Sequence, residues 1–453
     1  MAVIKIKKGL DIKLEGLPAP DIREALQTDT ITICPQEFKG IQPRLKIQEG
    51  DRVKRGSVLF FDKKNEAFQF RSPAAGIIQS IVLGPRRSIE QIIIDLARDE
   101  EIEPLKKYGV QEIPSLSRDE VLSHLFDTGY MALIKERPFS KLPNRERAPK
   151  SIFVNGMNTA PFQPDVNVVL GEQERFFQAG LDLLSKLTKG DVHLCVGETA
   201  SLKLKQTQNV KRHTFSGPHP SGNASVHIHF VDPISPGDTV WVIKAVDTIL
   251  LGQLFLEGAI PSSKIISVGG GGIHESARAH YRVRQGGSLR PILEHQLAGG
   301  FQRILSGDVL SGRAVPLDRP VPFLDACINV IPESEERFFM GWLMPGLNRF
   351  SHSSLFLSRW FRKKATWSLN TNQNGSIRAM VMTGWYDKFM PMNIKVDFLV
   401  RAVLAHDTDE AIKLGILETD PEDFALCSFV CPSKMDFYTI IKNGLEEIER
   451  EGL

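Results

Sequence analysis

The fold of the first part of the chain is decided by IQEGDRVKRGSVL at residues 47–59 and SPAAGII at residues 72–78. The glycines and the proline of these stretches suit tight turns, because Gly and Pro supply the backbone angles that turns require. Short β-type runs at residues 31–33, 58–61 and 91–95 are separated by Gly, Pro and charged residues. The pattern predicts a compact all-β module over residues 1–100.

The two turn motifs of this module resemble those of the barrel-sandwich fold of biotinyl and lipoyl domains. Carrier domains of that kind hold a modified lysine on the hairpin between their two halves, and Lys63 and Lys64 fall at about that place. Their context, DKKN, matches neither the Met-Lys-Met nor the Asp-Lys-Ala carrier pattern. A structural module is therefore predicted, with a lipoyl- or biotin-type carrier protein as an alternative.

The pattern changes after a polar linker that opens the 101–260 region. A strand-like run at residues 152–154, helical periodicity over 172–187 and an apolar run at 192–196 follow one another. Strand, helix and strand at this spacing predict a parallel α/β unit. A second alternation is expected from a strand at 225–231, an amphipathic helix at 239–257 and a strand at 264–268.

The rest of the chain divides into two further regions. Residues 261–330 are rich in Gly and mixed in pattern, which indicates a small α+β module. Helical periodicity at residues 409–417 and 438–451 indicates a helical domain over residues 331–453. The chain is therefore expected to be an α/β multidomain protein, as its length of 453 residues suggests.

Bulk composition excludes several classes of protein. The formal net charge is +2, with acidic and basic residues well mixed, so no nucleic-acid partner is indicated. A basic cluster at residues 359–364, RWFRKK, fits a solvated face or contact with an anionic membrane surface or acidic partner. Five cysteines, mostly far apart, fit a reducing cytoplasm. The most apolar stretch, residues 240–260, contains Lys, Asp, Gln and Glu, so no membrane span is predicted.

Histidines gather between residues 213 and 229. On a strand His227 and His229 would point to one face, an arrangement that can hold a metal. No carboxylate pair or thiol completes such a site nearby, so a hydrogen-bonded role is favoured and no metal is predicted. Loops rich in Pro and Gly at the ends of α/β strands often bind ligands. The candidate ligand loop therefore comprises the following residues: His219, Pro220, Gly222, His227 and His229.

Two other motifs are weak. The run of four glycines at residues 269–272 lacks the spacing of a dinucleotide fingerprint or a P-loop, so a flexible loop is expected. Cys427 and Cys431 lie four residues apart, but the remaining cysteines supply no spacing for an iron–sulfur cluster, and buried thiols are expected. No Gly-x-Ser-x-Gly elbow or other nucleophile arrangement is found.

Several segments in this order resemble the A subunit of the Na+-translocating NADH:quinone oxidoreductase family. They are the 47–78 module, RPF at 137–139, GPHP to HIHF at 217–230, LSGDVLSG at 305–312 and CSFVCP at 427–432. The resemblance implies a six-subunit translocase of the bacterial inner membrane, which passes electrons from NADH to ubiquinone and exports Na+. This chain would be peripheral on the cytoplasmic side and inactive alone, with the membrane-embedded subunits its chief partners among the five others.

The family is similar in turn to the NADH-binding flavin subunit of respiratory complex I. That similarity implies a Rossmann-like domain, a β-grasp (SLBB-like) module closed by residues 305–312, and a helical domain. The glycine-rich flavin loop and four-cysteine cluster of that relative are missing here. FAD, FMN, riboflavin and the 2Fe–2S cluster are therefore expected in partner subunits, with ubiquinone a candidate ligand of this one. An electron-transfer subunit of an ion-pumping ferredoxin oxidoreductase is a further alternative that would require a bound cluster.

Overall fold

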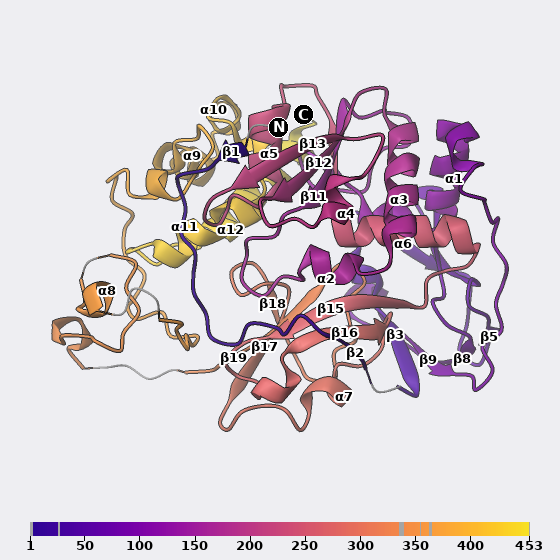
Figure 1. Cartoon of the computed structure of the whole chain (residues 1–453), viewed down its shortest axis with the longest axis horizontal. Coiled ribbons are helices and arrows are strands. Elements are labelled where there is room, and N and C mark those ends of the chain that lie inside the picture. Colours follow the sequence, from indigo (N-terminus) through magenta and orange to yellow (C-terminus); the bar gives the residue numbers. More distant parts are fainter. Residues whose placement is uncertain (1–2, 26–27, 335–338, 354, 362–364, 453) are drawn as a thin grey trace.

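The computed structural model describes residues 3–25, 28–334, 339–353, 355–361 and 365–452, with two six-stranded sheets, a two-sheet β module and a set of C-terminal helices. Figure 1 shows the two larger sheets stacked one above the other, with the β module at one end and the C-terminal helices at the other. Across the described ranges, no helix is both long and apolar enough to cross a membrane.

The predicted β module is present and consists of two small antiparallel sheets. One has the order β3-β9-β8-β5 and the other β4-β6-β7. Its core stacks Phe60 on Phe70, with ring centroids 5.2 Å apart, while Phe38 packs on both. The strands are β3 (Thr30–Ile33), β4 (Pro43–Leu45), β5 (Arg52–Val53), β6 (Val58–Asp62), β7 (Asn65–Arg71), β8 (Gly76–Leu83) and β9 (Ile89–Leu96).

The α/β sheet has the order β1-β13-β12-β11-β14-β10, in which only β10 runs antiparallel to its neighbour. The predicted strand–helix–strand unit is observed as β11 (Ser151–Gly156), α3 (Glu174–Leu187) and β12 (Val192–Gly197). The chain continues outward through β13 (Lys211–Ser216) and then returns to pair β14 (Val240–Lys244) with β11. The sheet is bordered by β1 (Val3–Lys5) and β10 (Lys135–Arg137).

Both faces of this sheet are covered, as parallel sheets require. Ile152 and Val154 of β11 belong to the core with α3 and α6 (Ala245–Glu257), whereas Phe153 belongs to the core on the other face. The helices α3 and α6 approach closely at Gly252, where an added Cβ would lie 1.8 Å from the Phe176 carbonyl oxygen. Shorter helices flank them: α1 (Arg118–Thr128), α2 (Val166–Leu170) and α4 (Leu202–Lys205).

The second predicted alternation is wrong in its element types. Residues 225–231 form the helix α5 (Ala224–Val231) instead of a strand, with Asn223 at the N-cap position. Residues 239–257 divide into β14 and α6, because the β-branched, aromatic run VWVI joins the sheet before the helix begins. Residues 264–268 do form a strand, β15 (Ser263–Gly269), but it belongs to the second large sheet.

That second sheet is mixed, with the order β18-β17-β19-β15-β16-β2. The glycine run after β15 is packed instead of forming a flexible loop. An added Cβ on Gly270 would lie 2.0 Å from the Val330 carbonyl oxygen, and the Gly270 N–H donates to the Gly16 carbonyl. The elements are β2 (Ile22–Glu24), β16 (Ala279–Arg284), α7 (Arg290–Leu293), β17 (Gln302–Ser306), β18 (Arg313–Val315) and β19 (Cys327–Pro332).

The C-terminal region is helical from Val396 onward. The helix predicted at residues 438–451 is confirmed, whereas the one predicted at 409–417 ends at Lys413 and is followed by a 3-10 turn at Ile416–Glu418. The helices of this region are α9 (Val396–Leu404), α10 (Thr408–Lys413), α11 (Ala425–Val430) and α12 (Phe437–Glu451). They cover the Phe153 face of the α/β sheet together with α5. Between β19 and α9 the described chain contains one α-helix, the short α8 (Ser358–Phe361), which protrudes from the body at the left of Figure 1.

The first residues of the chain lie outside the β module. β1 pairs with β13 of the α/β sheet, and β2 pairs with β16 of the second sheet. Only from β3 onward does the chain enter the two-sheet module. The N-terminal segment therefore joins the two large sheets along one side of the molecule (Figure 1).

Candidate functional site

A cavity of about 440 Å³ opens at the carboxyl ends of the α/β strands. The chain leaves β11 toward β12 on one side and returns through β14 on the other, so a switch in strand order lies between β11 and β14. Ligands of open α/β sheets bind at such points, outside the carboxyl ends of the strands. Asn155 near the end of β11 and Lys244 at the end of β14 are paired neighbours, and both line the cavity.

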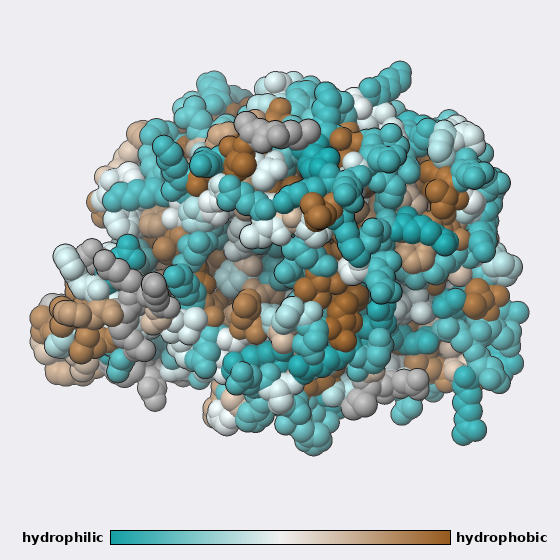
Figure 2. Space-filling view, viewed as in Figure 1, coloured by the Kyte–Doolittle hydropathy of each residue, from teal (hydrophilic) through white to brown (hydrophobic). Residues whose placement is uncertain are grey.

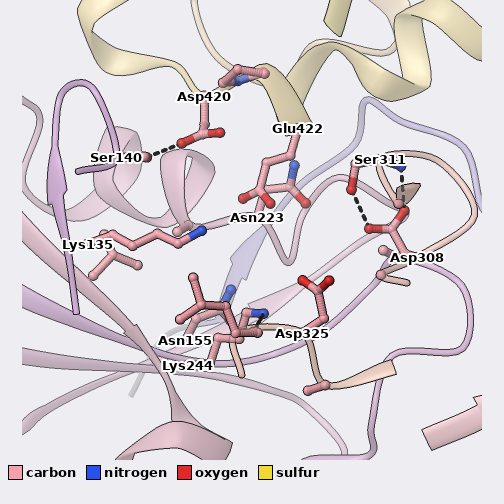
Figure 3. A pocket seen from close by; sticks show the side chains of 18 of the residues that line it. Lys135, Ser140, Asn155, Asn223, Lys244, Asp308, Ser311, Asp325, Asp420 and Glu422 are labelled. Atoms are coloured by element: carbon pink, nitrogen blue, oxygen red, sulfur yellow. Dashed lines mark hydrogen bonds between the residues drawn. The ribbon is translucent and has the colours of Figure 1, made fainter. Parts of the chain in front are cut away.

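Every region of the chain contributes to the cavity wall. Figure 3 shows Lys135 and Lys244 projecting toward the same space as Glu422 and Asp325, which come from other segments. Apolar side chains also line the cavity, among them Ile134, Leu324 and Leu445. The wall therefore presents charged and apolar groups side by side.

One wall is held by a buried arginine. The Arg137 side chain is 3% exposed, and its two terminal nitrogens donate to Asp420 Oδ2 and Ser225 Oγ, each at 2.6 Å. Ser140 also donates to Asp420 (Figure 3). Burial alone would raise the pKa of Asp420, but Arg137 and its neighbours hold it below the usual range. The pair fixes the C-terminal region against the α/β domain.

Glu422 stands next to this pair and has no such partner. Burial, with the nearby Asp420 and Asp423 carboxylates, raises the pKa of Glu422 to about 7. The side chain is exposed and opens to the cavity. Asp423 lies deeper, where Asn223 donates to its Oδ1 at 2.9 Å. Glu422 is therefore a carboxyl whose proton exchange inside the cavity is expected near neutral pH.

On the opposite wall of the cavity, lysine and aspartate side chains lie close to one another. Burial opposes the charge of Lys244, but Asp247 and Asp325 outweigh it and the pKa of Lys244 is raised. Ser306 donates to Asp325 at 2.6 Å. Lys264 lies just behind, where its ammonium donates to the carbonyl oxygens of Pro322, Phe323 and Asp325, so it is a structural cation.

The predicted ligand loop is only partly at the cavity. His219 and Gly222 line it, whereas Pro220, His227 and His229 are not among its lining residues. The N-terminal segment holds the loop, since the His219 N–H donates to Asp11 Oδ1 at 2.9 Å and the His219 carbonyl accepts from Leu10. Thr159 Oγ1 is 3.1 Å from His219 Nδ1, while Nε2 is buried without a hydrogen-bond partner. Burial lowers the pKa of His219 to about 4.

The expectation that His227 and His229 share a face is wrong, because both lie on the helix α5. Residues two apart on a helix point in different directions, whereas on a strand they point the same way. His227 is buried against Phe215, with ring centroids 4.5 Å apart and neither ring nitrogen hydrogen-bonded. His229 points to the C-terminal region, where its Nδ1 is 2.7 Å from Glu418 Oε2.

The remaining motifs lie away from the cavity or have structural surroundings. All five cysteines are free and buried, and only Cys327 lines the cavity. Among the described residues, no group of three or more His, Cys, Asp or Glu side chains could hold a metal ion. Lys63 and Lys64 form the exposed two-residue turn between β6 and β7. The basic cluster at 359–364 is described only as far as Phe361, and its last three residues lie outside the described ranges.

Sequence reasoning missed the main charged residues of the cavity: Lys135, Arg137, Lys244, Asp325, Asp420 and Glu422. Two of the lining residues did carry a signal. Asn155 and Lys244 each follow an apolar β run directly, and a polar residue at that place marks the carboxyl end of a strand. The others come from distant segments, and no local pattern brings them together.

Comparison with known proteins agrees with the order of these regions. Family models for the NqrA N-terminal barrel-sandwich hybrid domain and the NqrA second alpha/beta domain match residues 4–97 and 116–260. The A subunit of the Na(+)-translocating NADH-quinone reductase of Saccharophagus degradans is 39% identical over 99% of this chain and 100% of its own length. The chain belongs to the NqrA family. Other members are equally well covered, with 38% identity for the Haemophilus influenzae protein and 37% for that of Yersinia pestis.

Two solved structures of a NAD+-reducing [NiFe]-hydrogenase match this NqrA family member distantly. A NAD+-reducing [NiFe]-hydrogenase in the H2-reduced state aligns with 13% identity and a TM-score of 0.39, over 76% of this chain and 65% of that one. A score at this level carries no argument about the fold. The expected Rossmann-like and β-grasp assignments therefore stay predictions, as do the domain boundaries.

Proposed function

We propose that this chain is the peripheral A subunit of a Na+-translocating NADH:ubiquinone oxidoreductase on the cytoplasmic side of the bacterial inner membrane. The observation that carries the proposal is the similarity to named A subunits, at 37–39% identity over their whole length. In this role the chain works with five other subunits, chiefly membrane-embedded ones, and has no activity alone. FAD, FMN, riboflavin and the 2Fe–2S cluster are assigned to those partners and none to this chain.

We further propose that the cavity accepts the head group of ubiquinone. A quinone ring is flat and apolar, and its two carbonyl oxygens accept hydrogen bonds. Lys135, Lys244 and Asn155 supply donors beside apolar side chains such as Ile134 and Leu324. The volume of about 440 Å³ is within the range of ligand sites. Glu422 could release or take up a proton beside the ring, since its pKa of about 7 places the change near neutral pH.

The complex-level proposal is tested by purifying this chain from host membranes through an affinity tag. The expected result is co-purification with five partner subunits and NADH-dependent, Na+-stimulated quinone reduction, both lost when the gene is deleted. Purification of the chain alone from gently solubilised membranes would contradict the proposal. The intact mass of the same preparation tests the carrier alternative, because lipoylation or biotinylation of Lys63 or Lys64 would add mass.

The quinone proposal is tested separately by titrating the purified chain with a short-chain ubiquinone, followed by NMR. Signals from residues around the cavity should shift, and Lys244→Met and His219→Ala should weaken binding by about tenfold each, the loss expected for one hydrogen bond or packing contact. His229→Ala is the matched control, since this histidine points away from the cavity. Equal effects of all three substitutions, or none, would remove the cavity as the binding site.

A further inference from the structure

The segment from Phe339 to Phe361 exposes large apolar side chains to an unusual degree. Half of the exposed large hydrophobic residues among those described lie between residues 339 and 382. Phe339 is 87% exposed, Phe361 75% and Trp360 65%. Figure 2 shows hydrophobic side chains on the protrusion at the left end of the molecule, where Figure 1 places α8. A contiguous exposed apolar patch marks an interaction site.

The segment has a defined backbone even though its apolar side chains point outward. The Leu357 N–H donates to the Pro345 carbonyl at 2.9 Å, and Ser358 donates to the carbonyl of Arg349. Gly346 packs so closely on the Phe356 ring that an added Cβ would lie 2.4 Å away. The exposed side chains are therefore presented by a built structure.

Both ends of the protrusion are anchored to the body. Before the segment, the Glu333 N–H donates to the Phe301 carbonyl at 2.9 Å, and after it the Trp367 N–H donates to the Lys13 carbonyl at 2.8 Å. Within it, the Phe350 ring packs on Phe429 with centroids 5.7 Å apart. Because the base of the protrusion is held in place, its apolar tip can enter a non-aqueous environment while the rest of the molecule stays where it is.

The charge of this region is one-sided. The 50 residues from 337 to 386 contain seven Lys or Arg and no Asp or Glu, although the whole chain has 54 acidic residues. Arg359 lies exposed beside Trp360 and Phe361. Trp and Phe with flanking Arg and Lys, and no acidic residue, form the composition of segments that lie at a bilayer surface. The negative phosphates of an anionic bilayer complement the positive charge of this region, and the acyl region of the bilayer can bury its apolar tip.

We propose that the segment 339–361 inserts into the surface of an anionic phospholipid bilayer, with Trp360 and Phe361 in the acyl boundary and Arg359 at the phosphates. This inference goes beyond the proposed function, because it concerns the isolated chain and lipid alone. The two tests are independent. A chain that fails to bind vesicles could still co-purify with its partner subunits, so failure of this proposal would not decide the proposal about the complex.

The test is co-sedimentation of the purified chain with vesicles of pure phosphatidylglycerol and of pure phosphatidylcholine at low salt. The expected result is binding to phosphatidylglycerol, weak binding to phosphatidylcholine, and a decrease as salt is added. The double variant Trp360→Ser/Phe361→Ser should lower the partition coefficient at least about tenfold, because each side chain loses its burial in lipid. Arg359→Gln should lower it about fivefold on phosphatidylglycerol only.

The control is Leu17→Ser/Leu202→Ser, which removes two exposed apolar side chains outside the protrusion and should bind as the unaltered chain does. Failure of the unaltered chain to bind phosphatidylglycerol overturns the proposal, as does equal binding by the Trp360→Ser/Phe361→Ser variant. Absence of vesicle binding, combined with loss of partner subunits from that variant, would assign the patch to a protein partner instead. Circular dichroism of each variant checks that the fold is retained.

Discussion

The junction between the C-terminal region and the α/β domain, around the cavity, differs from the protruding segment 339–361 in the kind of side chain that it buries. At the junction, Arg137 is enclosed and paired with Asp420, which comes from a distant part of the chain. On the protrusion, apolar groups such as Phe339 and Trp360 are left uncovered. Enclosed charges have their partners within the chain, whereas exposed apolar groups can be buried only against another molecule. The contrast predicts that substitutions at the junction affect folding and those on the protrusion affect association.

The largest effect on the free energy of unfolding is expected from a substitution of Arg137. Arg137→Met leaves Asp420 enclosed without its cation, which should cost about 3–5 kcal/mol of the free energy of unfolding. Urea denaturation measures the loss. Arg290→Met is the matched control, because its partner Glu294 lies one turn away on the surface and such pairs contribute about 0.3–0.5 kcal/mol. Equal costs at the two positions would show that the buried pair does not hold the junction.

The second prediction concerns His227, whose pKa is lowered to about 3 by burial. Between the unfolded pKa of about 6.5 and that value, the unfolded chain binds one more proton than the folded chain. Stability therefore falls as the pH falls, by about 1.4 kcal/mol per pH unit for this group. His227→Phe should remove this contribution, so the variant gains about 3 kcal/mol relative to the unaltered chain from pH 6 to pH 4.

The measurement is urea denaturation of both proteins across that pH range. A difference between them that stays constant with pH would mean that His227 binds its proton as readily in the folded chain as in the unfolded chain. Such a result would also weaken the view that the junction excludes unpaired charge.

The third prediction concerns packing between α3 and α6. Gly252→Ala places a methyl group 1.8 Å from the Phe176 carbonyl oxygen before relaxation, so the helices must separate. We expect a loss of about 1–3 kcal/mol, as for other overpacked interiors. Gly299→Ala is the control, since an added Cβ there meets nothing within 4 Å. A neutral effect of Gly252→Ala would show that the helix pair adjusts freely.

The smallest effect on stability is expected on the protrusion. Trp360→Ser should change the free energy of unfolding by less than about 0.5 kcal/mol, the range typical of exposed positions. Trp241→Ser provides the contrast, because Trp241 is fully buried and donates to Glu136 at 3.2 Å. Thermal unfolding of the two variants compares them directly. A large loss from Trp360→Ser would mean that this side chain belongs to the protein core after all.

The sequence predicted best what is local. The turns around Gly50 and Gly56 indicated the β module, and the periodicity of residues 172–187 indicated α3. It failed where a short apolar run had two interpretations. Residues 225–231 have the composition of a strand, but the tertiary context makes them helical, with consequences for both histidines. The sequence also did not predict which sheet β15 joins. This strand looks like a continuation of the α/β alternation, yet it pairs with β16 and β19.

The cavity was the least predictable feature. Its rim near His219 and Gly222 was anticipated from Pro and Gly at a strand end. Its charges were not, because Lys135 and Glu422 are separated by most of the chain and meet only when the C-terminal region packs on α5 and the sheet. A local pattern can mark the end of a strand, but it cannot identify the distant segment that closes over it.

The placement of β1 and β2 has a consequence for how the protein is made. Val3 pairs with Thr214, and Ile22 pairs with His280, so β1 and β2 are synthesised well before the strands with which they pair. During synthesis the leading residues stay unpaired while the β module that follows them can already close. A bulky fusion at the amino terminus would therefore burden the last step of sheet completion, whereas a fusion after α12 would not.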